Sequence, residues 1–258
     1  MFLATPHSLH VQQISAVAAL GKPVWSEKPL ALARAEAERA IAATAKAKVP
    51  FGLGNNKRCF ASMRELKRVV EAGTLGEILH IEGNFSNEHS TRVKGGWRDD
   101  PRESPGGGMT GAGLHVLDAF VNLAGPIAKV DAHVFSQKLP PDPRDVAAAL
   151  IEFKSGATGL LATIRAAPMY WRIHVFGTKG WAEAREETML TVAKIGEQPK
   201  TTTYPQVDSL GTLIEAFAET IETGKPFVVS TADMLDVVGG IEAIIRSIAE
   251  RRPVTVTG

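Results

Sequence analysis

Cysteine is nearly absent from this 258-residue sequence, which contains only Cys59. A single cysteine excludes an intramolecular disulfide and any metal site assembled from several thiolates. Such sparse cysteine is typical of proteins in the reducing cytoplasm, and we expect the chain to be cytoplasmic.

Excess charge and long apolar runs are also missing. The 29 Lys and Arg residues nearly balance 28 Asp and Glu, so the net charge of +1 creates no field that would attract nucleic acid or an anionic membrane. No apolar run reaches the ~20 residues that span a bilayer, and the N-terminus lacks the basic start and long apolar stretch of a signal peptide. We therefore expect neither nucleic acid nor a membrane as a partner.

A glycine-rich nucleotide-binding turn is lacking as well. The one formal GxGxxG match covers residues 106–111, and Asp131 lies twenty residues beyond it. However, the charged, proline-containing stretch 98–105 cannot form the buried strand that must precede this fingerprint. No Walker-type Gly-Lys-Ser/Thr occurs either. We therefore reject the match.

Residues 1–54 alternate short apolar strands with helices. Apolar residues recur near helical spacing between residues 9 and 20, and an alanine-rich segment at 32–48 predicts a second helix. Strands are expected at 1–5, 23–25 and 49–53. Strand, helix, strand, helix, strand with short links predicts a parallel sheet with right-handed crossovers.

From residue 55 onward, strand patterns dominate. Glycine-containing turns at 154–157 and 177–180 predict hairpins. We expect a large, mostly antiparallel open sheet with helices on one face, so the fold class is α/β followed by α+β. The expected strands are 77–87, 130–135, 146–153, 158–165, 172–176, 181–185, 189–193 and 254–256, and the expected helices are 62–72, 109–123, 210–223 and 232–251.

The expected strand at 146–153 carries apolar residues in both alternating sets, which predicts that both of its faces are buried. Helices of the same chain can cover one face of the sheet, whereas the other face requires a partner. We therefore expect a homo-oligomer that forms by packing sheet against sheet.

Glu27, Lys28 and Pro29 directly follow the expected strand at 23–25. Because proline cannot donate to a sheet ladder, the strand ends there and leaves a charged pair at its end. Ligands bind at this edge of open α/β sheets, and an amine there can hydrogen-bond a reacting hydroxyl. The alternative is a solvated charged pair before a turn.

Five stretches, in order along the chain, resemble the Gfo/Idh/MocA family of NAD(P)-dependent oxidoreductases. They are residues 4–10 (ATPHSLH), 21–30 (GKPVWSEKPL), 73–78 (GTLGEI), 106–118 (GGGMTGAGLHVLD) and 175–180 (VFGTKG) with Glu183. The resemblance implies the C-terminal part of a Rossmann dinucleotide-binding domain over 1–54. It implies a substrate-binding and oligomerisation domain over 55–258.

The resemblance also implies the site residues. Lys28 matches the lysine that contacts nicotinamide and substrate, and His115 matches the histidine proposed as general acid or base. A structural helix histidine is the alternative for His115. The implied substrate-binding residues are Lys28, His115 and Asp118, and the implied cofactor-binding residues are Thr5, Pro6, His10, Glu27, Lys28, Pro29, Trp97 and Arg98.

Other candidate residues keep two interpretations each. Trp97 either lies near the cofactor or anchors its loop, and Asp118 either orients His115 or caps a local turn. Residues 56–58 either face the cleft or form a solvated basic edge. We expect His7 and His10 to have structural roles, because two histidines without a third ligand do not make a metal site. We therefore expect no bound metal.

The sequence departs from the family pattern in two places. Family members commonly carry an aspartate four residues before the histidine, where this chain has Gly111. The family's fold also starts with a nucleotide-binding half whose glycine-rich turn holds the pyrophosphate. Since that half does not occur in this sequence, we expect a piece of a longer reading frame begun at an internal methionine. Loss of the nucleotide half is the alternative.

The resemblance implies an oxidoreductase that uses NAD or NADP and acts on a secondary alcohol or ketone of a sugar, polyol or related small molecule. One alternative is a non-catalytic paralogue that serves as an oligomerising or ligand-binding module. Another is a lyase that uses a tightly held nicotinamide for transient oxidation.

Overall fold

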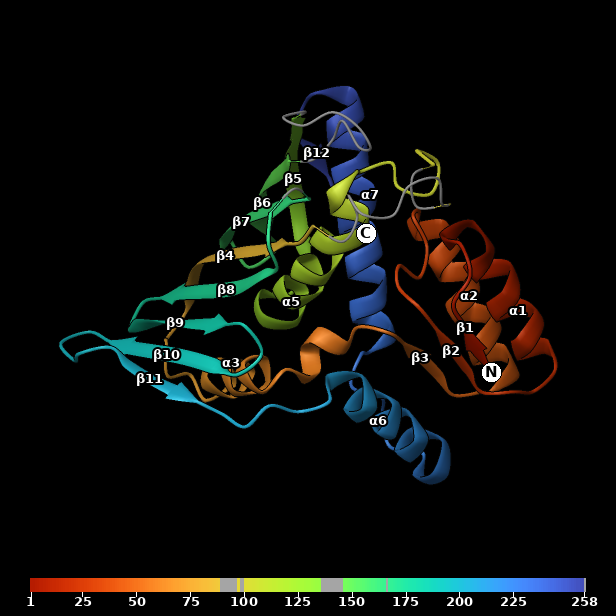
Figure 1. The fold of residues 1–258 in the computed structure, drawn as a ribbon. Helices are drawn as coiled ribbons and strands as arrows, with labels where there is room; N and C mark the ends of the chain where they lie inside the picture. The colour runs from red at the N-terminus through yellow and green to blue at the C-terminus, as the bar shows by residue number, and fades with distance from the viewer. Residues whose placement is uncertain (89–96, 98–99, 136–145, 166, 258) are drawn as a thin grey trace.

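Two β-sheets and the helices that accompany them form the structure, a computed structural model that describes residues 1–88, 97, 100–135, 146–165 and 167–257 (Figure 1). The long helix α7 (Thr231–Glu250) packs against both parts, since it contacts a helix of the small sheet and a strand of the large one. Within the described residues, no helix is both long and apolar enough to cross a membrane.

The small sheet is parallel, as the alternating pattern predicts. Its strand order is β1-β2-β3. The two crossover helices α1 and α2 pack against one another, and apolar residues such as Ile14, Val24 and Ala37 are buried between helices and sheet. The elements are β1 (Phe2–Leu3), α1 (His10–Ala19), β2 (Val24–Ser26), α2 (Arg34–Ala47) and β3 (Phe51–Leu53).

Over the described ranges, the large sheet has nine strands in the order β11-β10-β9-β8-β4-β7-β6-β5-β12. All neighbours are antiparallel except β4 and β7, so the expectation of a mostly antiparallel sheet is confirmed. The strands are β4 (Ile78–Ser86), β5 (Ile127–Phe135), β6 (Val146–Phe153), β7 (Thr158–Ile164), β8 (Tyr170–Gly177), β9 (Gly180–Arg185), β10 (Met189–Lys194), β11 (Lys200–Thr203) and β12 (Val254–Thr255).

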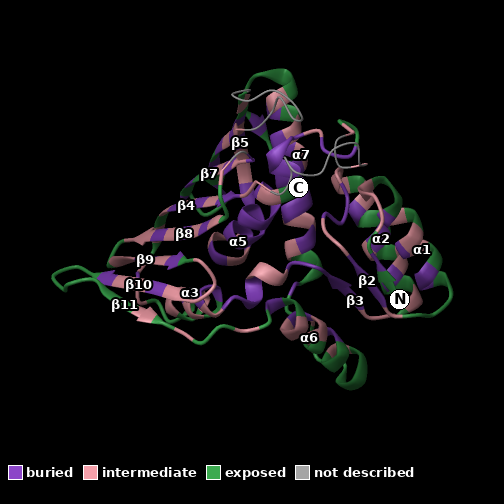
Figure 2. Ribbon diagram, viewed as in Figure 1, coloured by how far each residue is buried: buried purple, intermediate pink, exposed green. Residues whose placement is uncertain are grey.

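Helices cover one face of the large sheet, as expected. Helix α5 packs on β4, α7 on β5 and α3 on β9 and β10. Buried and less buried residues alternate along the strands, since one set of side chains points at these helices (Figure 2). The remaining helices are α3 (Ala61–Glu71), α5 (Leu114–Ala124) and α6 (Ser209–Thr223), with the short helical turns η1 (His7–Leu9), η2 (Asn56–Cys59) and η4 (Met109–Gly113).

The close approach of α5 to the sheet depends on a glycine. A Cβ added at Gly83 of β4 would overlap Val116 and Phe120 of α5. The missing side chain therefore lets the helix lie directly on the strand. This contact positions the N-terminal turn of α5, which carries His115, near the small sheet.

Candidate active site

Lys28 follows β2, at the end where ligands bind in parallel sheets. Its ammonium donates a hydrogen bond to the carbonyl oxygen of Gly111 over 3.0 Å. Gly111 belongs to η4, which leads directly into α5. The contact therefore joins the end of the small sheet to the start of the helix that carries His115.

His115 lies in the first turn of α5 and is 8% exposed. Its Nδ1 atom is buried and has no hydrogen-bond partner among the described residues. Burial lowers the pKa of His115 well below its usual value, and the positive charges of Lys28 and Lys57 lower it further. The ring is thus a neutral imidazole in the field of two ammonium groups.

The turn before α5 is a π-helix over Met109–Gly113, where the sequence predicts an ordinary helix from residue 109. Such wider turns are frequent at functional sites. Gly111 is exposed, and a Cβ built on it would meet no heavy atom within 4 Å. Among the described residues, none fills the position that a side chain at residue 111 would take.

His10, a candidate cofactor residue, is fully buried under two carbonyl groups. Its Nδ1 lies 2.7 Å from the Pro29 oxygen and its Nε2 lies 3.0 Å from the Thr5 oxygen. Both ring nitrogens are occupied by main chain, so His10 ties the segment after β1 to the segment after β2. The Thr5 hydroxyl donates to Gln13 of α1 over 2.7 Å.

Glu27 and Pro29 flank Lys28 and lie against neighbouring segments. A Cβ added at Gly54, just after β3, would come within 2.8 Å of a Glu27 carboxylate oxygen. The Glu27 side chain therefore covers the end of the third strand. Pro29 is buried and accepts the hydrogen bond from His10.

The Asp118 carboxylate is held by residues of η2 and its preceding loop. Arg58 donates to both carboxylate oxygens, at 2.9 Å and 2.7 Å, and Asn55 donates to one of them over 2.8 Å. Arg58 also forms an ion pair with Asp233 of α7 at 2.7 Å. Burial disfavours the charge of Arg58, but the contacts with Asp118 and Asp233 outweigh it and raise its pKa.

This network excludes one of the two interpretations of residues 56–58 for Arg58. Arg58 is buried and bridges α5 and α7, so it is not part of a solvated basic edge. Lys57 is half-buried, and its ammonium lies 4.2 Å from the centre of the Phe60 ring and 4.9 Å from that of Phe85. Burial lowers the pKa of Lys57, partly offset by the negative charges of Glu187 and Glu186.

His7, which lies near Lys28, and Glu103 were not assigned to the site from the sequence. His7 lies edge-on to Trp97 with 4.8 Å between ring centres, and its Nδ1 is 2.7 Å from the carbonyl oxygen of Glu103. This contact joins η1 to a residue 96 positions further along the chain, and no local pattern in the sequence indicates it. The candidate Arg98 lies outside the described residues.

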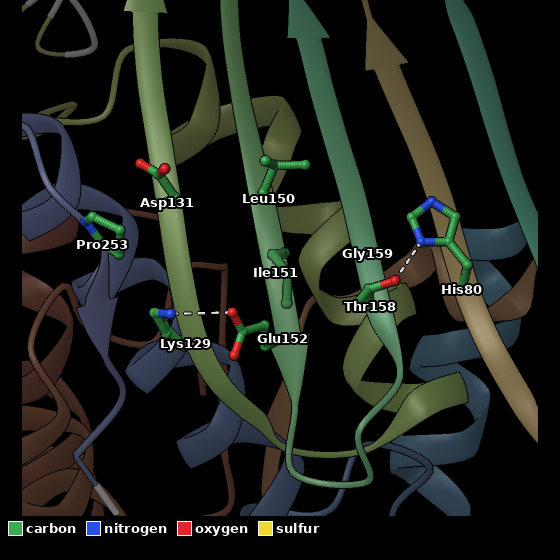
Figure 3. Close-up of a pocket in the computed structure, with 9 residues that line it drawn as sticks. All are labelled: His80, Lys129, Asp131, Leu150, Ile151, Glu152, Thr158, Gly159 and Pro253. Carbon is green, nitrogen blue, oxygen red and sulfur yellow. Dashed lines mark hydrogen bonds and ion pairs between the residues drawn. The ribbon is translucent and has the colours of Figure 1, made fainter.

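A hollow of about 410 Å³ lies elsewhere, on the outer face of the large sheet (Figure 3). Lys129 and Glu152 form an ion pair there at 3.1 Å, and His80 is hydrogen-bonded to Thr158 over 2.7 Å. Because α5 covers the opposite face, this hollow is separate from Lys28 and His115. Its lining residues are His80, Lys129, Asp131, Leu150, Ile151, Glu152, Thr158, Gly159 and Pro253.

Comparison with family models gives two matches. The model described as the GFO/IDH/MocA C-terminal domain matches residues 63–183. The model described as an oxidoreductase family with an NAD-binding Rossmann fold matches residues 1–55.

Individual proteins are similar over different shares of the chain. An uncharacterized oxidoreductase of Schizosaccharomyces pombe is 29% identical over 54% of this chain, which corresponds to 38% of that protein's length. The myo-inositol 2-dehydrogenase of Thermotoga maritima is 29% identical over 87% of this chain and 70% of that enzyme. The chain thus spans little more than a third of the first relative.

A solved structure has the same fold over the whole chain. Levoglucosan dehydrogenase in complex with NADH and levoglucosan superimposes with a TM-score of 0.89 at 25% identity. The match covers 100% of this chain and 80% of that one.

Proposed function

The chain belongs to the Gfo/Idh/MocA family of oxidoreductases, and from this membership and the geometry around Lys28 we propose its function. It transfers a hydride between NAD or NADP and a secondary alcohol or ketone of a sugar or polyol. Myo-inositol 2-dehydrogenase and levoglucosan dehydrogenase, both similar to this chain, act on substrates of that class.

The observation that carries the proposal is the meeting of Lys28 and His115. The Lys28 ammonium binds the turn that precedes His115, and its charge acts on that imidazole. The ring is neutral, and its Nδ1 has no hydrogen-bond partner in the part of the chain that the structure describes, unlike a histidine held for structure alone. An ammonium and a neutral imidazole at one site can together bind and deprotonate a hydroxyl group.

In the oxidation direction, His115 accepts the hydroxyl proton of the substrate. Lys28 donates a hydrogen bond to the same oxygen and stabilises the negative charge that develops on it. When bound, the nicotinamide ring supplies the acceptor for the hydride. In reduction, the protonated imidazole returns its proton to the carbonyl oxygen.

The cofactor would be held at the ends of β1 and β2. Thr5, Pro6, Glu27 and Pro29 lie there, and no heavy atom of a described residue lies within 4 Å of a Cβ built on Gly111. Trp97 lies on the same side through its contact with His7. In this proposal residues 1–54 contribute the nicotinamide end, and residues 55–258 contribute the substrate-binding and oligomerisation domain.

Asp118 has a positioning role in this proposal. Its carboxylate is engaged by Arg58 and Asn55, so it is not available to a substrate hydroxyl in this arrangement. It lies three residues after His115 on the same helix. The ion pair therefore fixes the rotation of α5 and with it the direction of the imidazole.

The proposal includes a cytoplasmic homo-oligomer formed through the outer face of the large sheet. Large apolar side chains are exposed on that face, with Phe135 at 50%, Leu150 at 59% and Leu160 at 39%. Monomeric proteins rarely leave several such side chains together in water. Packing two copies face to face would bury them.

The test is titration of the full chain with NADH and NADPH, followed by nicotinamide fluorescence, and assay of NAD⁺ and NADP⁺ reduction with myo-inositol and levoglucosan. Binding together with turnover of a polyol supports the proposal. His115→Asn should then lower turnover by about 10²-fold or more with little loss of cofactor affinity. Absence of dinucleotide binding contradicts the proposal, and binding without turnover of any polyol favours the non-catalytic alternative.

A further inference from the structure

His7 lies in the short turn η1, directly after β1, at the same sheet edge as Lys28. Its Nδ1 is 2.7 Å from the main-chain oxygen of Glu103. A carbonyl oxygen only accepts, so Nδ1 must carry the hydrogen. The Glu103 carbonyl therefore selects one tautomer of the ring.

The ring of His7 is neutral near pH 7. Burial lowers its pKa to about 4, and the charges of nearby His10 and Lys28 act in the same direction, against the opposing influence of Glu103. With the proton on Nδ1, the Nε2 atom has a free lone pair. Among the described residues, no group donates to that atom.

Two contacts hold the ring in place. Trp97 meets it edge-on with ring centres 4.8 Å apart and an interplanar angle of 83°. The Glu103 carboxylate accepts hydrogen bonds from the Ser8 amide at 3.0 Å and the Ser8 hydroxyl at 2.5 Å. These hydrogen bonds hold the segment around Glu103 against η1. They therefore keep the Glu103 carbonyl in position beside the His7 ring.

From this geometry we propose that His7 is a ligand-binding residue of the Lys28 site, which presents Nε2 as an uncharged hydrogen-bond acceptor. Its partner is an N–H or O–H donor of the bound molecules. Glu103 is its positioning residue. The inference rests on the proposed dehydrogenase function. The hydrogen-bond donors that the cofactor and the substrate of such an enzyme supply are the nicotinamide carboxamide and the substrate hydroxyls.

The proposal separates His7 from His115. The two imidazoles approach Lys28 from different parts of the fold, one from the small sheet and the other from α5. His7 binds through a lone pair without taking the proton. Its removal should therefore weaken binding rather than abolish the chemical step.

The experiment compares the full chain with His7→Phe, which keeps a ring for Trp97 and removes both nitrogens. The probes are NADH and the reduced acetylpyridine analogue, in which an acetyl group replaces the carboxamide and its N–H donors. His7→Phe should weaken NADH binding by about 3- to 10-fold, the usual range for one neutral hydrogen bond. The analogue should bind both proteins equally if the donor is the carboxamide.

A second arm detects a substrate hydroxyl as the donor. In that case His7→Phe leaves the affinity for both dinucleotides unchanged and raises the KM for myo-inositol by a similar factor, with kcat nearly constant. The control is Lys22→Met, because Lys22 is exposed and lies before β2, at the opposite end of that strand from Lys28. It should change none of these constants.

Nitrogen NMR of the His7 ring gives a readout that needs no cofactor. It should report a protonated Nδ1 and a bare Nε2 near pH 7. The opposite tautomer, or equal constants for the unmodified chain and His7→Phe in both arms, would overturn the inference while leaving the dehydrogenase function intact. Failure of the unmodified chain to bind any dinucleotide would overturn both.

Discussion

The Lys28 ammonium and the Gly111 carbonyl are 3.0 Å apart, although 83 residues separate them in the sequence. This hydrogen bond connects the small parallel sheet with the turn that begins α5. The position of Lys28 relative to His115 thus depends on both parts of the fold.

Replacing this ammonium should remove activity and preserve the fold. Lys28→Met keeps an unbranched four-atom stem and loses the ammonium with all its donors, so we expect turnover of a polyol to fall by about 10²- to 10⁴-fold. Lys28 is only half-buried, and its loss should leave thermal unfolding nearly unchanged. Steady-state kinetics and a melting curve provide the two measurements.

Lys22→Met is the matched control, because Lys22 is exposed and lies just before β2 rather than after it. It should match the unmodified chain in both measurements. Equal turnover in all three proteins would show that Lys28 has no part in the reaction.

Local patterns in the sequence were sufficient to predict most elements and the placement of Lys28 at a strand end. The polar strand β11 (Lys200–Thr203) was missed because it has no apolar alternation, and its position depends on pairing with β10. The π-turn before α5 was also missed, since its residues have an ordinary helical pattern.

The hydrogen-bond partners of the site residues could not be predicted from the sequence, because they are contacts between distant residues. Nothing near Asp118 in the sequence indicates that Arg58, 60 residues earlier, will occupy its carboxylate. Nor does the sequence show that His10 will turn both ring nitrogens to main-chain carbonyls. These partners are brought together only when the two parts of the chain fold against each other.

The buried ion pair makes Asp118 a strong determinant of stability. Asp118→Asn keeps the shape but removes the charge that compensates Arg58, and breaking such a buried pair from one side costs about 3–5 kcal/mol. Urea unfolding should show this loss. Glu65→Gln, in an exposed pair with Arg68, should change the unfolding free energy little. If Asp118→Asn lowered the unfolding free energy as little as Glu65→Gln does, the buried network would not be important for stability.

Gly52 and Gly111 should respond in opposite ways to alanine. A Cβ at Gly52 in β3 would come within 2.7 Å of the Phe217 ring and 3.0 Å of the Trp25 ring, so Gly52→Ala should cost about 1–3 kcal/mol through overpacking. Gly111→Ala meets no such obstacle and lies in a helical turn, so it should leave stability unchanged or raise it by up to about 1 kcal/mol. Chemical denaturation of the two variants checks both expectations.

The low pKa of His7 makes the fold sensitive to acid. In the folded chain this pKa is about 4, compared with 6.5 for an unperturbed histidine. Between these values the unfolded chain binds more protons, so stability is lost as the pH falls from 6.5 to 4. His7→Gln removes this contribution and should unfold less readily than the unmodified chain at pH 4, by about 1–2 kcal/mol after allowance for partial exposure. If the unfolding free energies of His7→Gln and the unmodified chain changed in parallel with pH, the low pKa of His7 would be contradicted.

The outer face of the large sheet gives the last prediction. Leu150 of β6 is 59% exposed at the hollow shown in Figure 3, where an arginine side chain would place a charge between two packed sheets. Light scattering should show an oligomer for the unmodified chain and a monomer for Leu150→Arg. The control is Ile195→Arg, because Ile195 is 79% exposed in the turn after β10, away from that hollow. If the unmodified chain were itself a monomer at micromolar concentration, the sheet face would not be an interface between copies, and its exposed leucines would need another explanation.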